Sequence, residues 1–184
     1  VYEENNISWA DKTIILKSEN GPQNCILTSG QDPLAPMPPI LVFNFWENTN
    51  NNVIDGFQFK GMGSSNTYGN GSSIFISCFT NLEIMNCLFK DGYSGNNYGA
   101  IGAVNSGWTC GDGTINISNS QFINNTGTAI WNYSPNLSVV IDSCSFINNS
   151  NSGAYGEAGA IQSWGDLDVS NSNFINNTSA NNDW

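Results

Sequence analysis

Hydrophobic positions recur along the chain in a short unit with the pattern Φ-x-Φ-x-x-small-x-Phe, where Φ is an aliphatic residue. A clear copy is the stretch LEIMNCLF, which begins at Leu82. Intervals of 30, 33, 24 and 28 residues separate the aromatic positions of successive copies, Phe59, Phe89, Phe122, Phe146 and Phe174. Such irregular intervals indicate one supersecondary unit per repeat, with loops of variable length between units.

The alternation of hydrophobic positions changes phase inside each unit. Leu82 and Ile84 share one face of a strand, whereas Cys87 and Phe89 share a face that is out of step with the first pair. This change predicts a corner between two short strands. A third short strand is expected upstream in each repeat, at residues 40–45, 73–78, 100–105, 128–133 and 159–164.

Three short strands per repeat, separated by Gly, Asn and Ser, predict an all-β fold. Each repeat would form one coil of a parallel β-solenoid, with three strands per coil and each strand paired to its counterpart in the next coil. Weaker strands at residues 7–9, 13–18 and 24–27 add an N-terminal coil. We therefore expect about six coils in a single domain spanning residues 1–184, with almost no helix.

Asparagine pairs follow the aromatic position in the later repeats, at residues 124–125, 148–149 and 176–177. Asn tolerates left-handed backbone angles, and stacked Asn amides can hydrogen-bond from one coil to the next. We interpret these pairs as a corner and a ladder rather than as ligands.

Five cysteines occur without a Cys-x-x-Cys motif, and the chain has no histidine, which argues against a zinc site. Cys25, Cys87 and Cys144 stand two residues before the aligned position in alternate repeats, as small inward-facing residues. Their Cα atoms would lie about 9.6 Å apart, beyond the reach of a disulfide. The candidate disulfide is therefore Cys78 with Cys110, and such a bond would indicate an oxidising extracellular location.

Two motifs together carry a resemblance to a known family. Gly-Ala-Ile strands at 99–101 and 159–161 are combined with Phe-x-x-Asn at 122–125, 146–149 and 174–177. This pairing resembles the repeat of chlamydial polymorphic outer membrane proteins and of Asn-rich adhesin-like surface proteins of methanogenic archaea. The opening residues 1–5 and 13–22 also resemble the first coil of many right-handed parallel β-helix proteins. The resemblance implies a right-handed parallel β-helix and says little about function.

Charge and composition exclude several functions. Fifteen acidic residues against four lysines, with no arginine, give a net charge of −11 at pH 7. Such a surface repels nucleic acid and anionic lipid, and no apolar run is long enough to cross a bilayer. Val1 enters in the middle of a coil pattern, and residues 177–184 show no amphipathic cap. We expect a segment of a longer chain, or a protomer that stacks end to end with copies of itself.

Nine N-x-Ser/Thr sequons are candidate N-glycosylation sites of a secreted protein, although a sequence this rich in Asn, Ser and Thr also forms sequons by chance. They are Asn6, Asn70, Asn116, Asn124, Asn132, Asn136, Asn148, Asn176 and Asn177.

Aromatic residues form the candidate binding surface. If Ile130 and Ile161 point inward, the alternation places Trp131, Tyr133 and Trp164 on the outer face of neighbouring coils, together with Phe75. Exposed aromatic rows stack on sugar rings or pack against another protein. Long loops folded over these rings would be the alternative.

Catalytic machinery is sparse. Without histidine, a Ser-His or Cys-His nucleophile system is excluded. Asp166 and Asp168 flank Leu167 and are the candidates for a polysaccharide lyase or glycosidase, although no basic residue is near them in sequence. A structural calcium ion at Asp112, within Gly-Asp-Gly, competes with a simple turn.

These patterns predict a non-catalytic, extracellular β-helix without an organic cofactor. We expect a rigid component of a cell-surface adhesin, stalk or fibre, which binds glycans, host surfaces or neighbouring copies. A carbohydrate-active β-helix enzyme that uses loop carboxylates is the alternative.

Overall fold

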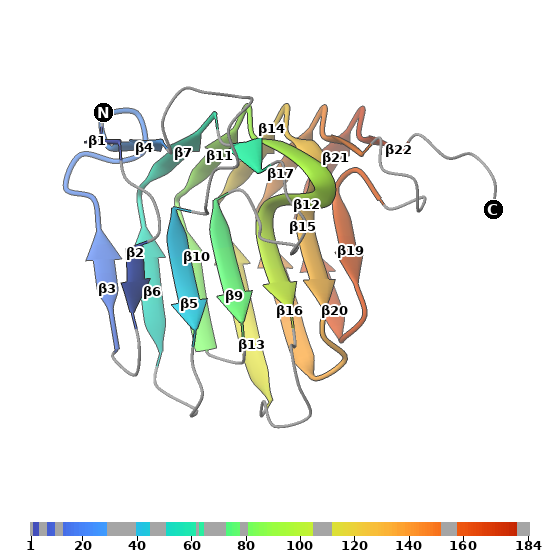
Figure 1. Cartoon of the computed structure of the whole chain (residues 1–184), viewed down its shortest axis with the longest axis horizontal. Coiled ribbons are helices and arrows are strands. Elements are labelled where there is room, and N and C mark those ends of the chain that lie inside the picture. Colours follow the sequence, from blue (N-terminus) through green and yellow to red (C-terminus); the bar gives the residue numbers. More distant parts are fainter. Residues whose placement is uncertain are drawn as a thin grey trace.

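A computed structural model describes residues 2–3, 7–9, 13–28, 40–44, 51–61, 63–64, 73–77, 81–104, 112–151 and 158–179 of the chain. The described strands form three parallel sheets that wind around a common axis, which is horizontal in Figure 1. The chain passes from the third sheet to the second, then to the first, and back to the third in the next coil.

The sheets contain seven, six and nine described strands. The first sheet holds β1 (Tyr2–Glu3), β4 (Ile26–Thr28), β7 (Gln58–Lys60), β11 (Leu88–Lys90), β14 (Gln121–Ile123), β17 (Ser145–Ile147) and β21 (Asn173–Ile175). The second sheet holds β3 (Ile15–Lys17), β6 (Asn52–Asp55), β10 (Asn81–Met85), β13 (Gly113–Ser118), β16 (Leu137–Asp142) and β20 (Leu167–Ser170). The third sheet holds β2 (Ile7–Trp9), β5 (Leu41–Asn44), β8 (Gly63–Ser64), β9 (Ile74–Ser77), β12 (Tyr93–Val104), β15 (Thr126–Tyr133), β18 (Ser150–Asn151), β19 (Ile161–Ser163) and β22 (Thr178–Ser179).

The prediction of an all-β parallel solenoid with three strands per coil is confirmed, and no helix occurs among the described residues. The expected number of six coils is wrong, because the structure shows about three turns. The right-handed sense of the coil stays a prediction.

Identical positions of successive repeats stack in register. In the second sheet, Ile54 pairs with Ile84, Ile84 with Ile117 and Ile117 with Ile141. In the first sheet the aligned phenylalanines pair, and their rings stack with centroids 4.7–4.9 Å apart and planes within 5° of parallel. This distance matches the strand spacing of about 4.8 Å, so the sheet register itself brings the rings into contact.

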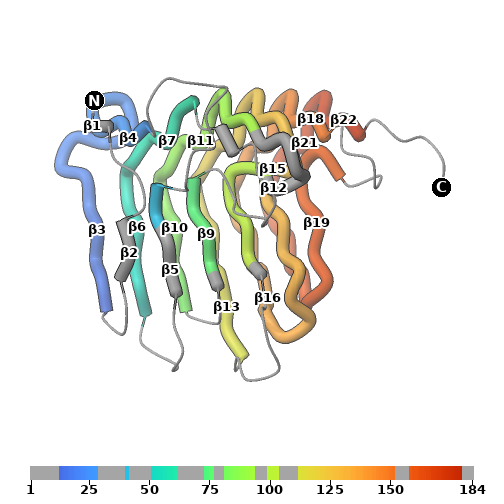
Figure 2. Tube along the Cα trace, viewed as in Figure 1, coloured from blue at the N-terminus to red at the C-terminus, as the bar shows by residue number. Residues whose placement is uncertain are grey.

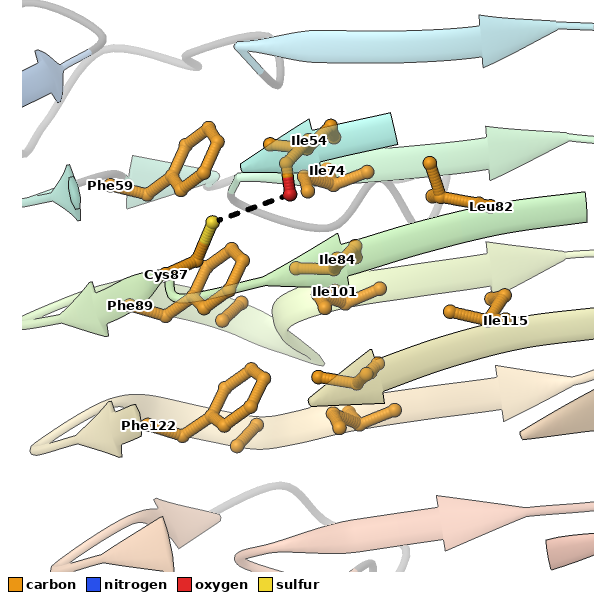
Figure 3. Packing of buried hydrophobic residues seen from close by; sticks show 14 of the residues in the cluster. Ile54, Phe59, Ile74, Leu82, Ile84, Cys87, Phe89, Ile101, Ile115 and Phe122 are labelled. Atoms are coloured by element: carbon orange, nitrogen blue, oxygen red, sulfur yellow. Dashed lines mark hydrogen bonds between the residues drawn. The ribbon is translucent and has the colours of Figure 1, made fainter. Parts of the chain in front are cut away.

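Small residues beside the phenylalanine stack leave room for the corner (Figure 3). Cys87 and Cys144 are buried free thiols, and the Cys87 Sγ contacts the Ile54 carbonyl oxygen at 3.8 Å. Ser120 takes the same place in the coil between them, where its hydroxyl accepts a hydrogen bond from the Cys87 amide at 3.1 Å. Cys25 is also free and half-buried. The predicted inward column of small residues is therefore confirmed.

The Asn pairs have two distinct roles. The first member of each pair, at 124, 148 and 176, has φ between +53° and +55°, as the predicted corner requires. The second members form the predicted ladder: the side-chain Nδ2 of Asn125 donates to Asn149 Oδ1 at 2.9 Å, and that of Asn149 donates to Asn177 Oδ1 at 2.8 Å. Asn149 Nδ2 also donates to the Phe122 carbonyl at 2.9 Å, so the ladder closes the corner beside the aromatic stack.

The Gly-Ala-Ile motif has a steric reason. A Cβ atom at Gly99 would overlap the carbonyl of Thr128 in the next coil, so the strands can approach only if this position is glycine. In the same region, the chain from Tyr93 to Ile101 is longer than the matching stretch of β15 from Thr126 to Ile130. Strand β12 runs from Tyr93 to Val104 with register shifts against β15, so the extra residues are accommodated within the sheet.

Removing one ring from the middle of the aromatic stack should destabilise the whole solenoid. We expect Phe122→Ala to lower the free energy of unfolding by about 3–5 kcal/mol, because the ring is fully buried between two others. Urea denaturation followed by circular dichroism measures this loss. Phe174→Ala is the matched control, since that ring is 48% exposed and touches one ring of the stack. Equal losses for the two variants would contradict the stacking account.

Stability should be greatest between about pH 4 and pH 9. Hydrogen bonds from Asn86 and the nearby Lys17 lower the pKa of Asp55 below 3.8, and bonds from Asn171, Ser170 and Ser143 lower that of Asp142. These contributions are present above pH 3.8 and are lost as the pH falls through the lowered values. Burial raises the pKa of Cys87 from 9.0 to about 11, so its contribution is present below pH 9.0 and is lost as the pH rises to 11.

The unfolding midpoint in urea, measured across this pH range, tests the expectation. Asp142→Asn is the control, because it should reduce the acidic limb to the contribution of Asp55 and leave the alkaline limb unchanged. An acidic limb that is identical in this variant would contradict the role given to the carboxylate.

Candidate functional site

The lower corner is the edge at which the chain passes from the third sheet to the second, at residues 134–136 and 164–166. It runs along the lower edge of Figure 2. Asn132 holds this corner together from the inside: its Nδ2 donates to the Leu137 carbonyl and to Ser163 Oγ, both at 2.9 Å, and its Oδ1 accepts from the Ser134 amide at 3.0 Å. One buried side chain thus fixes the turn in one coil and ties it to the next coil.

Glycine at 165 lets the two coils meet closely at this corner. A Cβ atom there would overlap the Leu137 carbonyl oxygen. The Trp164 amide also donates to the Asn132 carbonyl at 2.9 Å. The backbone at Trp164 is therefore held by its own hydrogen bond to Asn132 and by the close contact at the following Gly165.

Three aromatic side chains lie together on the outer face at this corner. The Trp131 and Tyr133 rings stack with centroids 5.0 Å apart and an interplanar angle of 7°, and Tyr133 meets Trp164 at 4.1 Å and 53°. Their side chains differ in exposure: Trp131 is 5% exposed, Tyr133 41% and Trp164 57%. Tyr133 and Trp164 therefore form the accessible part, which we call the aromatic platform, and Trp131 supports it from one side.

This arrangement refines the predicted row of four aromatics. Phe75 is half-buried on the outer face of β9 and is aligned with Gly102, which in turn is aligned with Trp131. Phe75 and Trp131 thus stand two coils apart, roughly 9.6 Å, with no side chain between them at the glycine. The structure brings together Trp131, Tyr133 and Trp164, and leaves Phe75 apart.

A polar cleft of about 520 Å³ lies at the lower corner, on the side of the second sheet. Within the second sheet, Asn81, Thr114 and Ser138 are paired in register, and Asp166 continues this column directly before β20. Pro135 is the second residue after Tyr133, and Asp166 is the second residue after Trp164, so the cleft and the platform share one corner. The residues that line the cleft are Asn81, Asp112, Gly113, Thr114, Pro135, Asn136, Ser138 and Asp166.

Sequence reasoning missed this cleft. The signal was present in the repeat, because a polar residue precedes the first aliphatic position in each of four units, at 81, 114, 138 and 166. Two carboxylates that had been considered separately, those of Asp112 and Asp166, line the same cleft. Asp168 is exposed on β20, two residues from Asp166, and is not among the residues that line the cleft.

The described residues contain no group of three or more His, Cys, Asp or Glu side chains that could hold a metal ion. Asp112 is exposed at the edge of the cleft, whereas Gly111 lies outside the described residues. A calcium ion at this turn therefore stays a prediction.

The sequons differ in accessibility. Exposed side chains are found at Asn116, Asn124, Asn136, Asn148 and Asn176. Asn177 is half-buried in the ladder. Asn132 does not fit the role of an acceptor, because it is fully buried and its amide group is occupied by the hydrogen bonds of the lower corner. Asn6 and Asn70 lie outside the described residues, as do both members of the candidate disulfide, Cys78 and Cys110.

The fold and the site together define the class of protein: a parallel β-solenoid with an aromatic platform and a polar cleft at one corner. In the part of the chain that is described, no helix is long and apolar enough to span a membrane. No family model, no curated protein and no solved structure matches the chain.

Glycan occupancy should follow this accessibility. When the protein is secreted from a eukaryotic host, we expect glycans at the exposed Asn116 and Asn136 and an unmodified Asn132 in the folded product, because a glycan at Asn132 would displace the bonds that close the corner. Peptide mapping by mass spectrometry reads each site separately. A glycan on Asn132 in soluble, folded protein would contradict this structure of the corner.

Proposed function

We propose that the chain is a rigid, non-catalytic β-solenoid that binds carbohydrate at the lower corner, as part of an extracellular adhesin, stalk or fibre. The observation that carries the proposal is that the exposed Tyr133 and Trp164 rings and a polar cleft occur at the same corner of the solenoid. Sugars present apolar CH faces and a rim of hydroxyl groups. A site with aromatic faces next to amide, hydroxyl and carboxylate groups matches both features.

Rigidity supports this proposal. Tyr133 and Trp164 stand on neighbouring coils whose spacing is set by the sheet register and by Asn132. Because the platform is already formed in the absence of ligand, little side-chain entropy needs to be lost on binding. An adhesive surface gains affinity from such preorganisation without any moving part.

A non-catalytic role is supported by the chemistry of the cleft. Its ionisable side chains are the carboxylates of Asp112 and Asp166, and no basic side chain is present among the lining residues. A polysaccharide lyase needs a base together with a group that neutralises the substrate carboxylate. A glycosidase with two carboxylates remains the alternative, because these two groups share one cleft.

The proposed surface location rests on composition and on the repeat. Few charges, many Asn, Ser and Thr residues, and exposed sequons suit a secreted protein. The resemblance of the Gly-Ala-Ile and Phe-x-x-Asn motifs to adhesin-like right-handed β-helix proteins supports the same location.

Neighbouring copies are the second proposed partner. The last described coil exposes the apolar side chains of Leu167, Val169, Phe174 and Ile175. An apolar coil face with unpaired strand edges can add a further coil, whether from the same chain or from a second copy. Sedimentation velocity across a concentration series distinguishes a monomer from end-to-end assemblies.

Replacing Trp164 should weaken carbohydrate binding. We expect Trp164→Ala to lower the affinity for hexameric oligosaccharides by about tenfold, because the variant loses the larger part of the exposed aromatic face. Isothermal titration calorimetry with neutral, amino and uronic acid hexamers measures the loss. Tyr93→Ala is the matched control: Tyr93 is similarly exposed, at 49%, but begins β12 at another corner.

Three results would count against the proposal. Absence of binding to every hexamer would contradict the proposed carbohydrate binding. A loss of affinity in the Tyr93 variant equal to that in the Trp164 variant would also contradict it. Release of reducing ends from a polysaccharide, abolished by Asp166→Asn, would replace it with the enzyme.

A further inference from the structure

The chemistry of the cleft restricts which glycan can occupy the corner. Of the eight lining residues, Asp112 and Asp166 carry negative charge and none carries positive charge. The remaining lining residues offer hydroxyl, amide and backbone groups. A uronic acid or sulfated sugar would bring its own anion to two carboxylates with no cation to compensate them.

The described lysines cannot supply that cation. Lys17 pairs with Asp55 at 3.1 Å, at the opposite end of the second-sheet strands from the cleft. Lys90 lies 3.5 Å from Asp91 in the first sheet, and Lys60 is its neighbour in register. With a net charge of −11, the long-range field of the protein also attracts cations and repels anions.

The two carboxylates are placed along the solenoid axis. Thr114 is paired with Ser138, and Asp166 continues the column one coil further. Asp166 therefore stands two coils, roughly 9.6 Å, from the level of β13, which Asp112 directly precedes. This separation is comparable to the length of a disaccharide, so two amino groups on one oligosaccharide can each approach a carboxylate.

We propose that the lower corner binds glycans that carry free amino groups, that is, polymers of unacetylated hexosamine. The exposed Trp164 ring, which Tyr133 supports from behind, stacks on the apolar face of one sugar. Asp112 and Asp166 accept hydrogen bonds from the ammonium groups of the neighbouring sugars. This inference rests on the proposed function and names the class of ligand for the same site.

The test compares three hexamers in isothermal titration calorimetry, at low and at physiological ionic strength: glucosamine, N-acetylglucosamine and galacturonic acid. The glucosamine hexamer should bind most tightly, and the galacturonic acid hexamer at least about tenfold more weakly. Asp166→Asn and Asp112→Asn should each weaken glucosamine binding by about two- to fivefold, as expected for one exposed charge pair. Neither change should alter binding of the N-acetylated hexamer by as much.

Asp168→Asn is the matched control. It removes the same charge from an exposed position two residues from Asp166, outside the cleft. Its affinity for the glucosamine hexamer should stay at the wild-type value. If Asp168→Asn weakens binding as much as Asp166→Asn does, the protein attracts amino sugars through its net charge alone, and the inference fails.

The remaining outcomes separate the inference from the proposed function. Equal affinity for all three hexamers, with a loss in the Trp164 variant, would overturn the amino-sugar inference and leave carbohydrate binding in place. Tighter binding of galacturonic acid would do the same. Absence of binding to all three hexamers would overturn both.

Discussion

In-register stacking of identical positions at the strand spacing is the constraint on which the structure depends. Every inward position must tolerate a similar side chain about 4.8 Å above and below it, without a buried charge. Phenylalanine meets this requirement through stacked rings, as in Phe89 on Phe122. Asn125 and Asn149 meet it in a different way, because each amide donates to the next and to a backbone carbonyl, so no polar group in the ladder is left unsatisfied.

The same constraint explains why the proposed binding site is located at a corner. Inward columns are fixed by their neighbours in the adjacent coils, whereas outward positions can change from coil to coil without disturbing the register. The outward column that contains Gly102, Trp131 and Gln162 shows this freedom, since three unlike side chains follow one another. Rings and carboxylates can therefore be placed at the lower corner at little cost to the fold, and the repeat holds them rigidly in position.

Much of the fold could be predicted from the sequence because the repeat encodes it directly. The strands, the aromatic column, the small residues at Cys87 and Ser120 and the Asn ladder all follow from period-two alternation and its change of phase. The outward side of Trp131 was also predictable. Its burial was not, since exposure of an outer ring depends on its neighbours in space rather than on strand parity.

The cleft and the role of Asn132 were hidden for a related reason. Asn132 lies within a predicted strand and carries a sequon, and nothing in its local pattern shows that its amide closes the turn ahead and reaches Ser163 in the next coil. The cleft combines residues at the starts of successive strands of the second sheet, and two of its members, Asp112 and Asp166, are 54 residues apart in sequence. Alignment of the repeats shows which residues are equivalent to Asp166 in the other repeats. It does not show that these residues line a cleft, because the cleft depends on the conformation of the turns.

Hydrogen–deuterium exchange with and without the glucosamine hexamer tests most directly the claim that a rigid repeat carries its ligand chemistry at one corner. The account predicts slow exchange along β11, β14 and β17 in both states, and ligand-dependent protection confined to residues 112–114, 131–138 and 164–166. Protection at the Asn ladder, or a change spread over all three sheets, would contradict it.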